Sequence, residues 1–168
     1  MRKITIAALL VLALSGCATT GQYGNFVPPT AAVDQQQLAR EAVQQLAVLY
    51  PPAKTRLELQ QATPDAFGQA LVLTLRERGY ALLEFNPASA KAQATAASEP
   101  ASPAALPLRY VLDQAGDSNL YRLTLLVGNQ SITRPYLVQD GSFAPAGYWV
   151  RKECPMSDQA DQMAPDAS

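Results

Sequence analysis

The chain contains 168 residues, with 13 basic and 14 acidic side chains, two cysteines and no histidine. The length suffices for one domain with a modest core, and the near-neutral charge gives no electrostatic footprint for nucleic acid. The lack of histidine excludes the commonest general base, the Ser-His-Asp triads and most transition-metal sites.

The amino-terminal segment has the features of an export signal. Arg2 and Lys3 precede an apolar and small stretch at residues 4–14, which is too short to span a bilayer. The stretch ends in Leu14-Ser15-Gly16-Cys17, which resembles the bacterial lipobox. We therefore predict a lipoprotein signal peptide at residues 1–16. The alternatives are an ordinary secretory signal and an apolar amino-terminal helix of a cytoplasmic protein.

The lipobox resemblance implies a covalent lipid on Cys17 and no other cofactor. Diacylglycerol would be attached to the Cys17 sulfur, the chain would be cleaved before this residue, and the new amino terminus would be acylated with palmitate. Such acyl chains anchor a protein to a membrane without spanning it. Ala18, and not aspartate, follows the cysteine, which resembles the sorting pattern for the outer membrane. The expected location is the periplasmic face of the outer membrane.

Residues 17–30 are rich in Gly, Thr and Pro and show no sustained periodicity, which predicts a flexible tether. Tyr23 and Phe26 within it are candidates for contact with a partner or with the bilayer interface. Cleavage removes two basic residues, so the mature chain has 11 basic and 14 acidic side chains and a net charge of −3. No stretch mixes closely spaced Lys and Arg with aromatic residues, and we expect no direct nucleic-acid binding.

An amphipathic helix is predicted after Pro28-Pro29-Thr30, with Thr30 or Asp34 as its cap. Apolar residues recur at helical spacing up to Leu49, opposite a glutamine-rich polar face. The helix should end at Tyr50, because a residue that precedes a proline is biased away from helical dihedral angles. The alternating residues 55–61 then predict a half-buried strand.

A second helix is predicted to begin at Thr63-Pro64-Asp65. Thr63 supplies a capping hydroxyl, Pro64 takes the first helical position, and the carboxylate of Asp65 lies near the positive end of the helix dipole. Gly79 is a natural stop for the helix. Residues 80–85 then predict the next strand.

The remaining sequence is β-like. Residues 86–105 consist almost wholly of Ala, Ser, Pro, Gln and single charges, and predict a mobile loop. Four strands are predicted after it, at residues 106–114, 120–128, 132–139 and 147–153. Pro107 and Pro135 favour edge strands or bulges for their segments. The polar tail at residues 154–168 is predicted to be disordered.

The predicted element order is therefore α-β-α-β-loop-β-β-β-β, in a single domain at residues 31–153. Two helices cannot cover both faces of such a sheet. The predicted fold class is α+β, a two-layer sandwich with two amphipathic helices packed on one face of a mainly antiparallel sheet. The sequence contains no phosphate-binding glycine loop, nucleophile elbow or ligand-spaced carboxylate cluster, so we predict no enzyme, no catalytic residues and no metal site.

The strand around the only tryptophan is the best candidate for a partner contact. Tyr148, Trp149 and Arg151 could form an aromatic and cationic hot spot, and the alternative is that Trp149 caps the core. Cys154 is the one cysteine left if Cys17 is acylated. In an oxidising compartment it could form an interchain disulfide or stay a free thiol.

Several strings together resemble the TrbH family of conjugal transfer lipoproteins, found in P-type plasmid mating-pair-formation operons. They are Leu14-Ser15-Gly16-Cys17-Ala18-Thr19-Thr20-Gly21, Leu49-Tyr50-Pro51-Pro52, Gln61-Ala62-Thr63-Pro64-Asp65-Ala66-Phe67-Gly68 and Arg78-Gly79-Tyr80-Ala81-Leu82-Leu83-Glu84. The resemblance covers most of the mature chain up to about Glu153. It implies a structural component of a type IV secretion apparatus for plasmid transfer, in contact with core-complex proteins of the channel.

A second function of a different class stays open. The chain could be a periplasmic lipid- or partner-binding auxiliary lipoprotein of an envelope transporter. That function predicts an apolar cleft between the helices and the sheet, and lipid that co-purifies with the protein.

Overall fold

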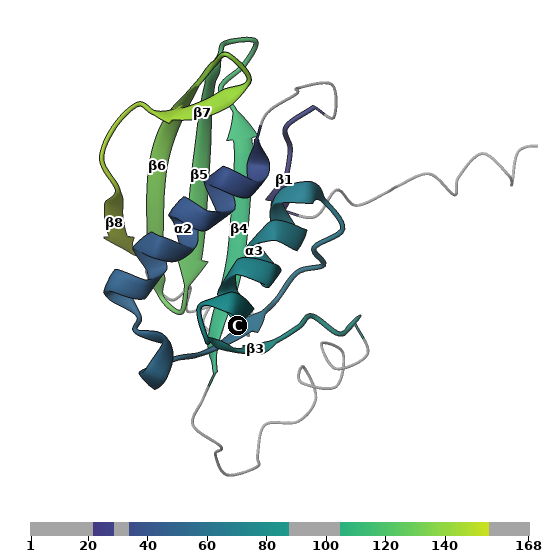
Figure 1. Cartoon of the computed structure of the whole chain (residues 1–168), viewed down its shortest axis with the longest axis vertical. Helices are drawn as coiled ribbons and strands as arrows, with labels where there is room; N and C mark the ends of the chain where they lie inside the picture. The colour runs from purple at the N-terminus through teal and green to yellow at the C-terminus, as the bar shows by residue number, and fades with distance from the viewer. Residues whose placement is uncertain (1–21, 29–33, 88–104, 155–168) are drawn as a thin grey trace, which may run out of the picture.

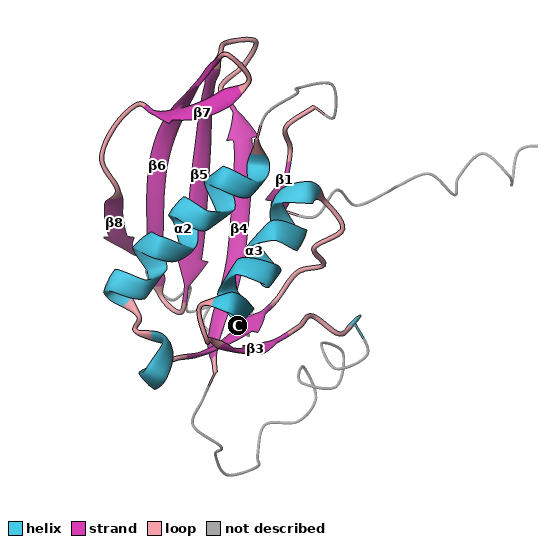
Figure 2. Cartoon of the chain, viewed as in Figure 1, coloured by secondary structure: helices cyan, strands magenta, loops and turns pink. Residues whose placement is uncertain are grey.

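The computed structural model describes residues 22–28, 34–87 and 105–154. Two helices, α2 (Gln35–Leu49) and α3 (Ala66–Glu77), lie on one face of an eight-stranded sheet (Figure 2). A short 3-10 turn, η2 (Pro52–Lys54), follows α2. The strands are β1 (Gly24–Asn25), β2 (Arg56–Leu59), β3 (Ala81–Leu83), β4 (Leu106–Gln114), β5 (Leu120–Val127), β6 (Gln130–Gln139), β7 (Ser142–Pro145) and β8 (Val150–Glu153).

The predicted fold class is confirmed, because the two helices and a mostly antiparallel sheet form an α+β sandwich. The strand order is β3-β2-β4-β5-β6-β7, with β1 beside β4 and β8 beside β6 (Figure 1). The pairs β2–β3, β2–β4 and β1–β4 are parallel, and all pairs from β4 through β8 are antiparallel. The predicted loop and tail fall almost wholly outside the described residues.

The first helix has the cap and the end that the sequence predicts. The Asp34 side chain accepts hydrogen bonds from the backbone N–H groups of Gln36 and Gln37, each at 3.0 Å. The helix ends at Tyr50, whose backbone N–H donates to the Leu46 carbonyl at 2.7 Å. The alternative cap, Thr30, lies outside the described residues.

The start of the second helix differs from the prediction. Asp65, and not Thr63, is the cap of α3, and its side chain accepts from the Gly68 N–H at 2.9 Å. Pro64 therefore precedes the cap instead of taking the first helical position. A carboxylate accepts this bond more strongly than a hydroxyl does. Gly79 follows the carboxy-terminal cap with φ 86°, which agrees with the predicted stop.

The last part of the sheet holds one strand more than predicted. Asp140 (φ 49°) and Gly141 (φ 74°) form a tight turn of the primed kind, so β7 pairs back onto β6 as a hairpin. The predicted strand at residues 147–153 begins only at Val150, since the backbone leaves the sheet after β7 and returns as β8.

The two strand prolines do not mark edge strands, which corrects the edge-strand alternative of that prediction. Pro135 lies in β6 between β5 and the outer strands. Its carbonyl accepts from the Ala146 N–H at 3.0 Å, so its ring nitrogen faces the gap between β7 and β8, where no strand needs a donor. Pro107 precedes the first β4–β5 pair, Leu108↔Val127. Both prolines thus avoid breaking the ladder inside interior strands.

The core lies between the sheet and the helices. Alternate residues of β4 and β5, together with Ile132 and Tyr136 of β6, are buried beneath the helices, and the largest of them are Tyr110 and Tyr136. Phe67 of α3 packs edge-on against Tyr110 with ring centroids 5.1 Å apart. Val27, just after β1, belongs to the same core and is 8% exposed.

Candidate functional site

The predicted lipidation site lies outside the described residues. These begin at Gln22, five residues after Cys17, so Leu14, Ser15, Gly16 and Cys17 are not placed. Within the described residues, no helix is both long and apolar enough to cross a bilayer. In the same part of the chain, no three Asp, Glu, Cys or His side chains gather as metal ligands would.

Residues 22–28, inside the predicted tether, lie along the central part of the sheet. Gly24 and Asn25 pair in parallel with Val111 and Leu112 of β4. The Phe26 N–H then donates to the Leu112 carbonyl at 2.7 Å. Glycine at residue 24 suits its φ of 144°, which side chains disfavour. The described part of this segment is therefore attached to the folded domain.

Tyr23 contacts a strand residue on the side of the sheet that the helices leave uncovered. The guanidinium carbon of Arg109 lies 4.8 Å from the centre of the Tyr23 ring, a cation–π geometry. Arg109 also donates to the Gln60 side-chain oxygen at 2.5 Å. Phe26 is 46% exposed and lies close by along the same segment. Of the two predicted contact residues in this segment, Tyr23 is held against the domain and Phe26 remains open to solvent.

A side chain fills the gap that β2 and β1 leave along the edge of β4. The β2 pairing ends at Leu108 and the β1 pairing starts at Val111. Between them, the backbone N–H of Tyr110 donates to the Gln61 side-chain oxygen at 2.9 Å. Gln61 is 8% exposed, and its side-chain NH₂ has no hydrogen-bond partner among the described residues. The sequence did not predict that Gln61 takes the place of a neighbouring strand, because a glutamine side chain that accepts a backbone hydrogen bond has no characteristic spacing.

Asp65 joins three elements at the same place. Besides capping α3, its carboxylate accepts from the Tyr110 hydroxyl at 2.5 Å and from the Asn25 side-chain amide at 3.2 Å. Burial first, and then the Asp65 carboxylate, raise the pKa of Tyr110 well above its ordinary value. Gly68 is required here, since a Cβ at this position would lie 2.3 Å from the Tyr110 hydroxyl oxygen.

A hollow of about 580 Å³ opens beside this junction. Its walls come from residues 22–26 and from the turn that leads from β2 into α3, including Ala62 and Pro64. Among the described residues, the only charged side chain that lines it is Asp65, whose oxygens already accept the hydrogen bonds just described. The hollow is therefore lined mainly by uncharged and apolar groups.

The predicted aromatic strand is divided between the core and the solvent. Trp149 packs against Tyr136, with ring centroids 6.4 Å apart, and is partly buried against the core. Tyr148 is 90% exposed, and Arg151 of β8 is also exposed. Trp149 therefore caps the core, whereas Tyr148 is available to a partner.

A charged network holds this edge to the first helix. Arg134 of β6 donates to the Gly147 carbonyl at 2.8 Å and pairs with Glu41 of α2. The Tyr136 hydroxyl donates to the same Glu41 oxygen at 3.1 Å. Burial first, and then the Glu41 charge, raise the pKa of Tyr136 well above its ordinary value. The backbone next to Tyr148 is thus held in place, because partly buried Arg134 binds the Gly147 carbonyl and is itself paired with Glu41.

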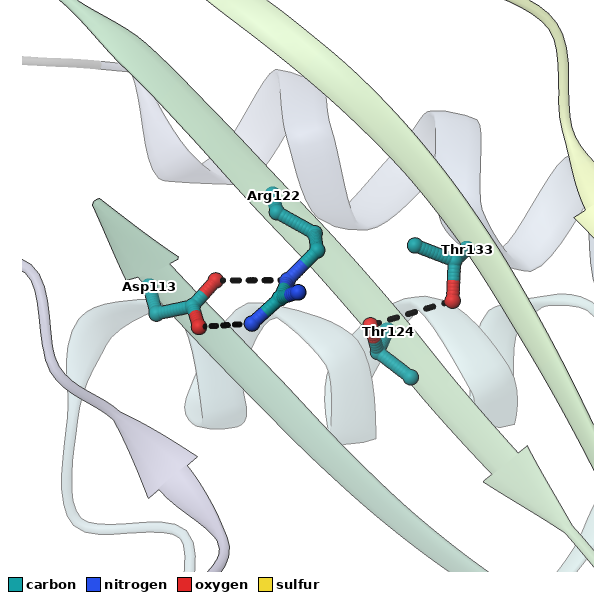
Figure 3. A network of polar contacts seen from close by, with 4 residues as sticks. All are labelled: Asp113, Arg122, Thr124 and Thr133. Atoms are coloured by element: carbon teal, nitrogen blue, oxygen red, sulfur yellow. Dashed lines mark hydrogen bonds and ion pairs between the residues drawn. The ribbon is translucent and has the colours of Figure 1, made fainter. Parts of the chain in front are cut away.

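The face of the sheet opposite the helices carries polar pairs across its strands (Figure 3). Arg122 donates to both oxygens of Asp113, at 3.1 and 2.5 Å. The hydroxyls of Thr124 and Thr133 lie 3.1 Å apart. Arg122 is exposed, so we expect this ion pair to contribute little stability.

Cys154 ends the described chain next to the β5–β6 turn. Its backbone N–H donates to the Asn129 carbonyl at 2.6 Å, and its thiol is free and partly exposed. The interchain disulfide stays a prediction.

Comparisons with known proteins place this chain in a family. The family model described as conjugal transfer protein TrbH matches residues 20–153, well over half of the chain. A second model, for a prokaryotic membrane lipoprotein lipid attachment site, matches residues 1–18. No curated protein and no solved structure gives a match. The match at residues 1–18 indicates a lipid-anchored envelope lipoprotein. The match over the folded domain confirms the resemblance, and the chain belongs to the family of conjugal transfer protein TrbH.

Proposed function

We propose that this lipoprotein is lipidated on Cys17, resides at the periplasmic face of the outer membrane, and is a structural component of the type IV secretion apparatus for conjugal DNA transfer. Family membership carries the role in conjugal transfer. Cys17 is the only cysteine within the matched lipid attachment site. The residue after it, Ala18, supports the outer-membrane location.

The proposed docking surface is the edge formed by β7 and β8, with Tyr148 between them. An edge strand offers unpaired backbone groups to a strand of a partner, and an exposed tyrosine next to it can supply the anchor. Tyr148 is 90% exposed, yet Arg134 and Glu41 hold the backbone on which it stands. A tyrosine on a fixed backbone has only two side-chain torsion angles, so it loses little conformational freedom when it binds. The partner in this proposal is a core subunit of the secretion channel.

The anchor is tested by Cys17→Ser in plasmid-bearing cells. This variant should lose the lipid, leave the outer membrane and abolish plasmid transfer, as measured by mating frequency. The matched control is Cys154→Ser, which keeps the anchor and should retain transfer unless the interchain disulfide is needed. Full transfer by the Cys17→Ser variant would contradict the proposal.

The docking surface is tested by affinity purification from detergent-solubilised outer membranes, followed by mass spectrometry. Tyr148→Ala should reduce recovery of channel subunits by about fivefold or more, the usual effect of removing an interface hot spot. Leu73→Ala on α3 is the control, because Leu73 is 59% exposed and α3 packs beside β1 and β3, away from the β7–β8 edge. Recovery of lipid or transporter proteins in place of channel subunits would favour the auxiliary-lipoprotein function instead.

A further inference from the structure

The distance between the lipid and the folded domain is limited by covalent geometry. Four residues lie between Cys17 and Gln22, where the attached segment begins, so five Cα–Cα steps connect the two. An extended chain covers at most about 3.3–3.6 Å per residue, so the two Cα atoms can be no more than roughly 18 Å apart. A tether of residues 17–30 would have allowed the domain to move more than twice as far.

This limit on the distance between Cys17 and the domain applies because residues 22–28 are attached to the domain. The segment is held by strand pairing to β4, by the Tyr23–Arg109 stacking and by the Val27 side chain in the core. The Asn25 amide adds hydrogen bonds to Gln35 of α2 and to Asp65, at 2.9 and 3.2 Å. Separating this segment would break contacts to the sheet and to both helices.

The surface at this end of the tether has the composition of a membrane interface. Phe26 is 46% exposed beside the hollow, and Ala62 and Pro64 form the opposite wall. Tyr23 presents an aromatic ring with Arg109 over its face. Aromatic rings and cationic side chains with apolar stems settle at the headgroup level of bilayers.

We infer that this anchor-side surface, formed by Tyr23, Phe26, Ala62 and Pro64, lies against the lipid headgroups of the membrane that holds the anchor. The short tether keeps it there. The β7–β8 edge is three strand spacings from β4, roughly 14 Å away, and stays free for a protein (Figure 1). The inference rests on lipidation at Cys17 and is independent of the docking on channel subunits.

The test uses the full lipidated protein in vesicles of phosphatidylethanolamine and phosphatidylglycerol with brominated acyl chains, which quench nearby tryptophan. Trp149 is the only tryptophan, so Trp149→Phe provides a silent background. Phe26→Trp in this background should lose at least about twice as much fluorescence as the matched Val48→Trp control, since interfacial side chains reach the upper acyl region. Circular dichroism verifies that both variants are folded.

A spacer variant separates the short tether from any affinity of the surface for lipid. An insertion of about ten Gly and Ser residues between Gly21 and Gln22 adds a mean span of roughly 17 Å and should reduce the quenching of the Phe26→Trp variant toward that of the control. Equal quenching of the two tryptophan variants, no quenching of Phe26→Trp, or no effect of the spacer would overturn the inference. If the Trp149→Phe background does not fold, hydroxyl-radical footprinting of the wild-type protein gives the same answer. Phe26 should then be protected in the lipidated protein on vesicles and exposed in the unlipidated Cys17→Ser protein in solution.

Vesicles contain no channel subunits, so the result stays separate from the proposed function. Quenching together with unchanged mating in Cys17→Ser would retain the membrane contact and reject the role of the anchor in transfer. Equal quenching of the two tryptophan variants together with loss of mating in Cys17→Ser would retain the role of the anchor and reject the membrane contact.

Discussion

At the scale of single residues, the junction of β4, α3 and β1 depends on two neighbouring requirements. Asp65 must accept hydrogen bonds from a helix N–H, a phenol and an amide, and Gly68 must leave room for that phenol. The sequence predicted a helix start here. It did not reveal that the Tyr110 hydroxyl, 45 residues away in the chain, shares the cap.

The first prediction concerns Gly68→Ala. Alanine usually stabilises a helix by about 1 kcal/mol relative to glycine, but here its Cβ would lie 2.3 Å from the Tyr110 hydroxyl oxygen and 2.9 Å from Thr63 Cβ. We expect the free energy of unfolding to fall by about 2–4 kcal/mol, as measured by urea denaturation. The double variant with Tyr110→Phe should recover part of the loss, because the clashing oxygen is then absent. A stability equal to wild type for Gly68→Ala would contradict this account.

At the scale of elements, the sequence predicted the regular segments well and the exceptional ones poorly. The long strands β4, β5 and β6 and both helices follow from periodicity and capping residues. The two-residue strand β1 has no periodicity to detect, and its pairing depends on the space that β2 leaves beside β4. The β7 strand was not predicted, because its four residues, Ser142–Pro145, are too few to show a clear strand periodicity and end in a proline.

The turn before β7 supplies the second prediction. Gly141 has φ 74° and Asp140 has φ 49°, and asparagine tolerates such left-handed angles better than most residues do. Gly141→Ala should lower the free energy of unfolding by about 1–2 kcal/mol, and Asp140→Asn should leave it unchanged or slightly raised. Thermal melting of the two variants beside wild type checks both signs. Equal effects of the two changes would show that this turn does not direct the pairing of β7.

At the scale of the whole molecule, two buried tyrosines couple the sheet to both helices, Tyr110 through Asp65 of α3 and Tyr136 through Glu41 of α2. Sequence analysis predicted the two-layer arrangement, which follows from the amount and spacing of apolar residues. It left open whether Trp149 caps the core or contacts a partner. The carboxylate partners of the tyrosines could not be predicted, since they depend on which strand lies under which helix turn.

The third prediction concerns alkaline pH. Burial raises the pKa of Tyr110 and Tyr136 in the folded state above the value that they have in the unfolded chain. The stability that they contribute is fully present below pH of about 10 and is lost as pH rises beyond it, because the unfolded chain releases its phenolic protons first. Each tyrosine should steepen the loss by about 1.4 kcal/mol per pH unit. Tyr136→Phe should remove one such contribution from the slope of the free energy of unfolding against pH, between pH of about 10 and 11.5. Denaturant unfolding measures this slope. An unchanged slope would contradict the raised pKa of Tyr136.

The pairing of β1 with β4 also has a mechanical consequence. Any pull between the membrane and the assembled apparatus enters the domain at Gln22 and reaches the centre of the sheet through a two-residue strand. Because only two residues of β1 pair with β4, this pairing should break under force before the helices or the antiparallel strands do. Its release would let the chain between Gln22 and Asp34 extend to at most roughly 40 Å. The segment would then extend under force, while the rest of the domain stays folded.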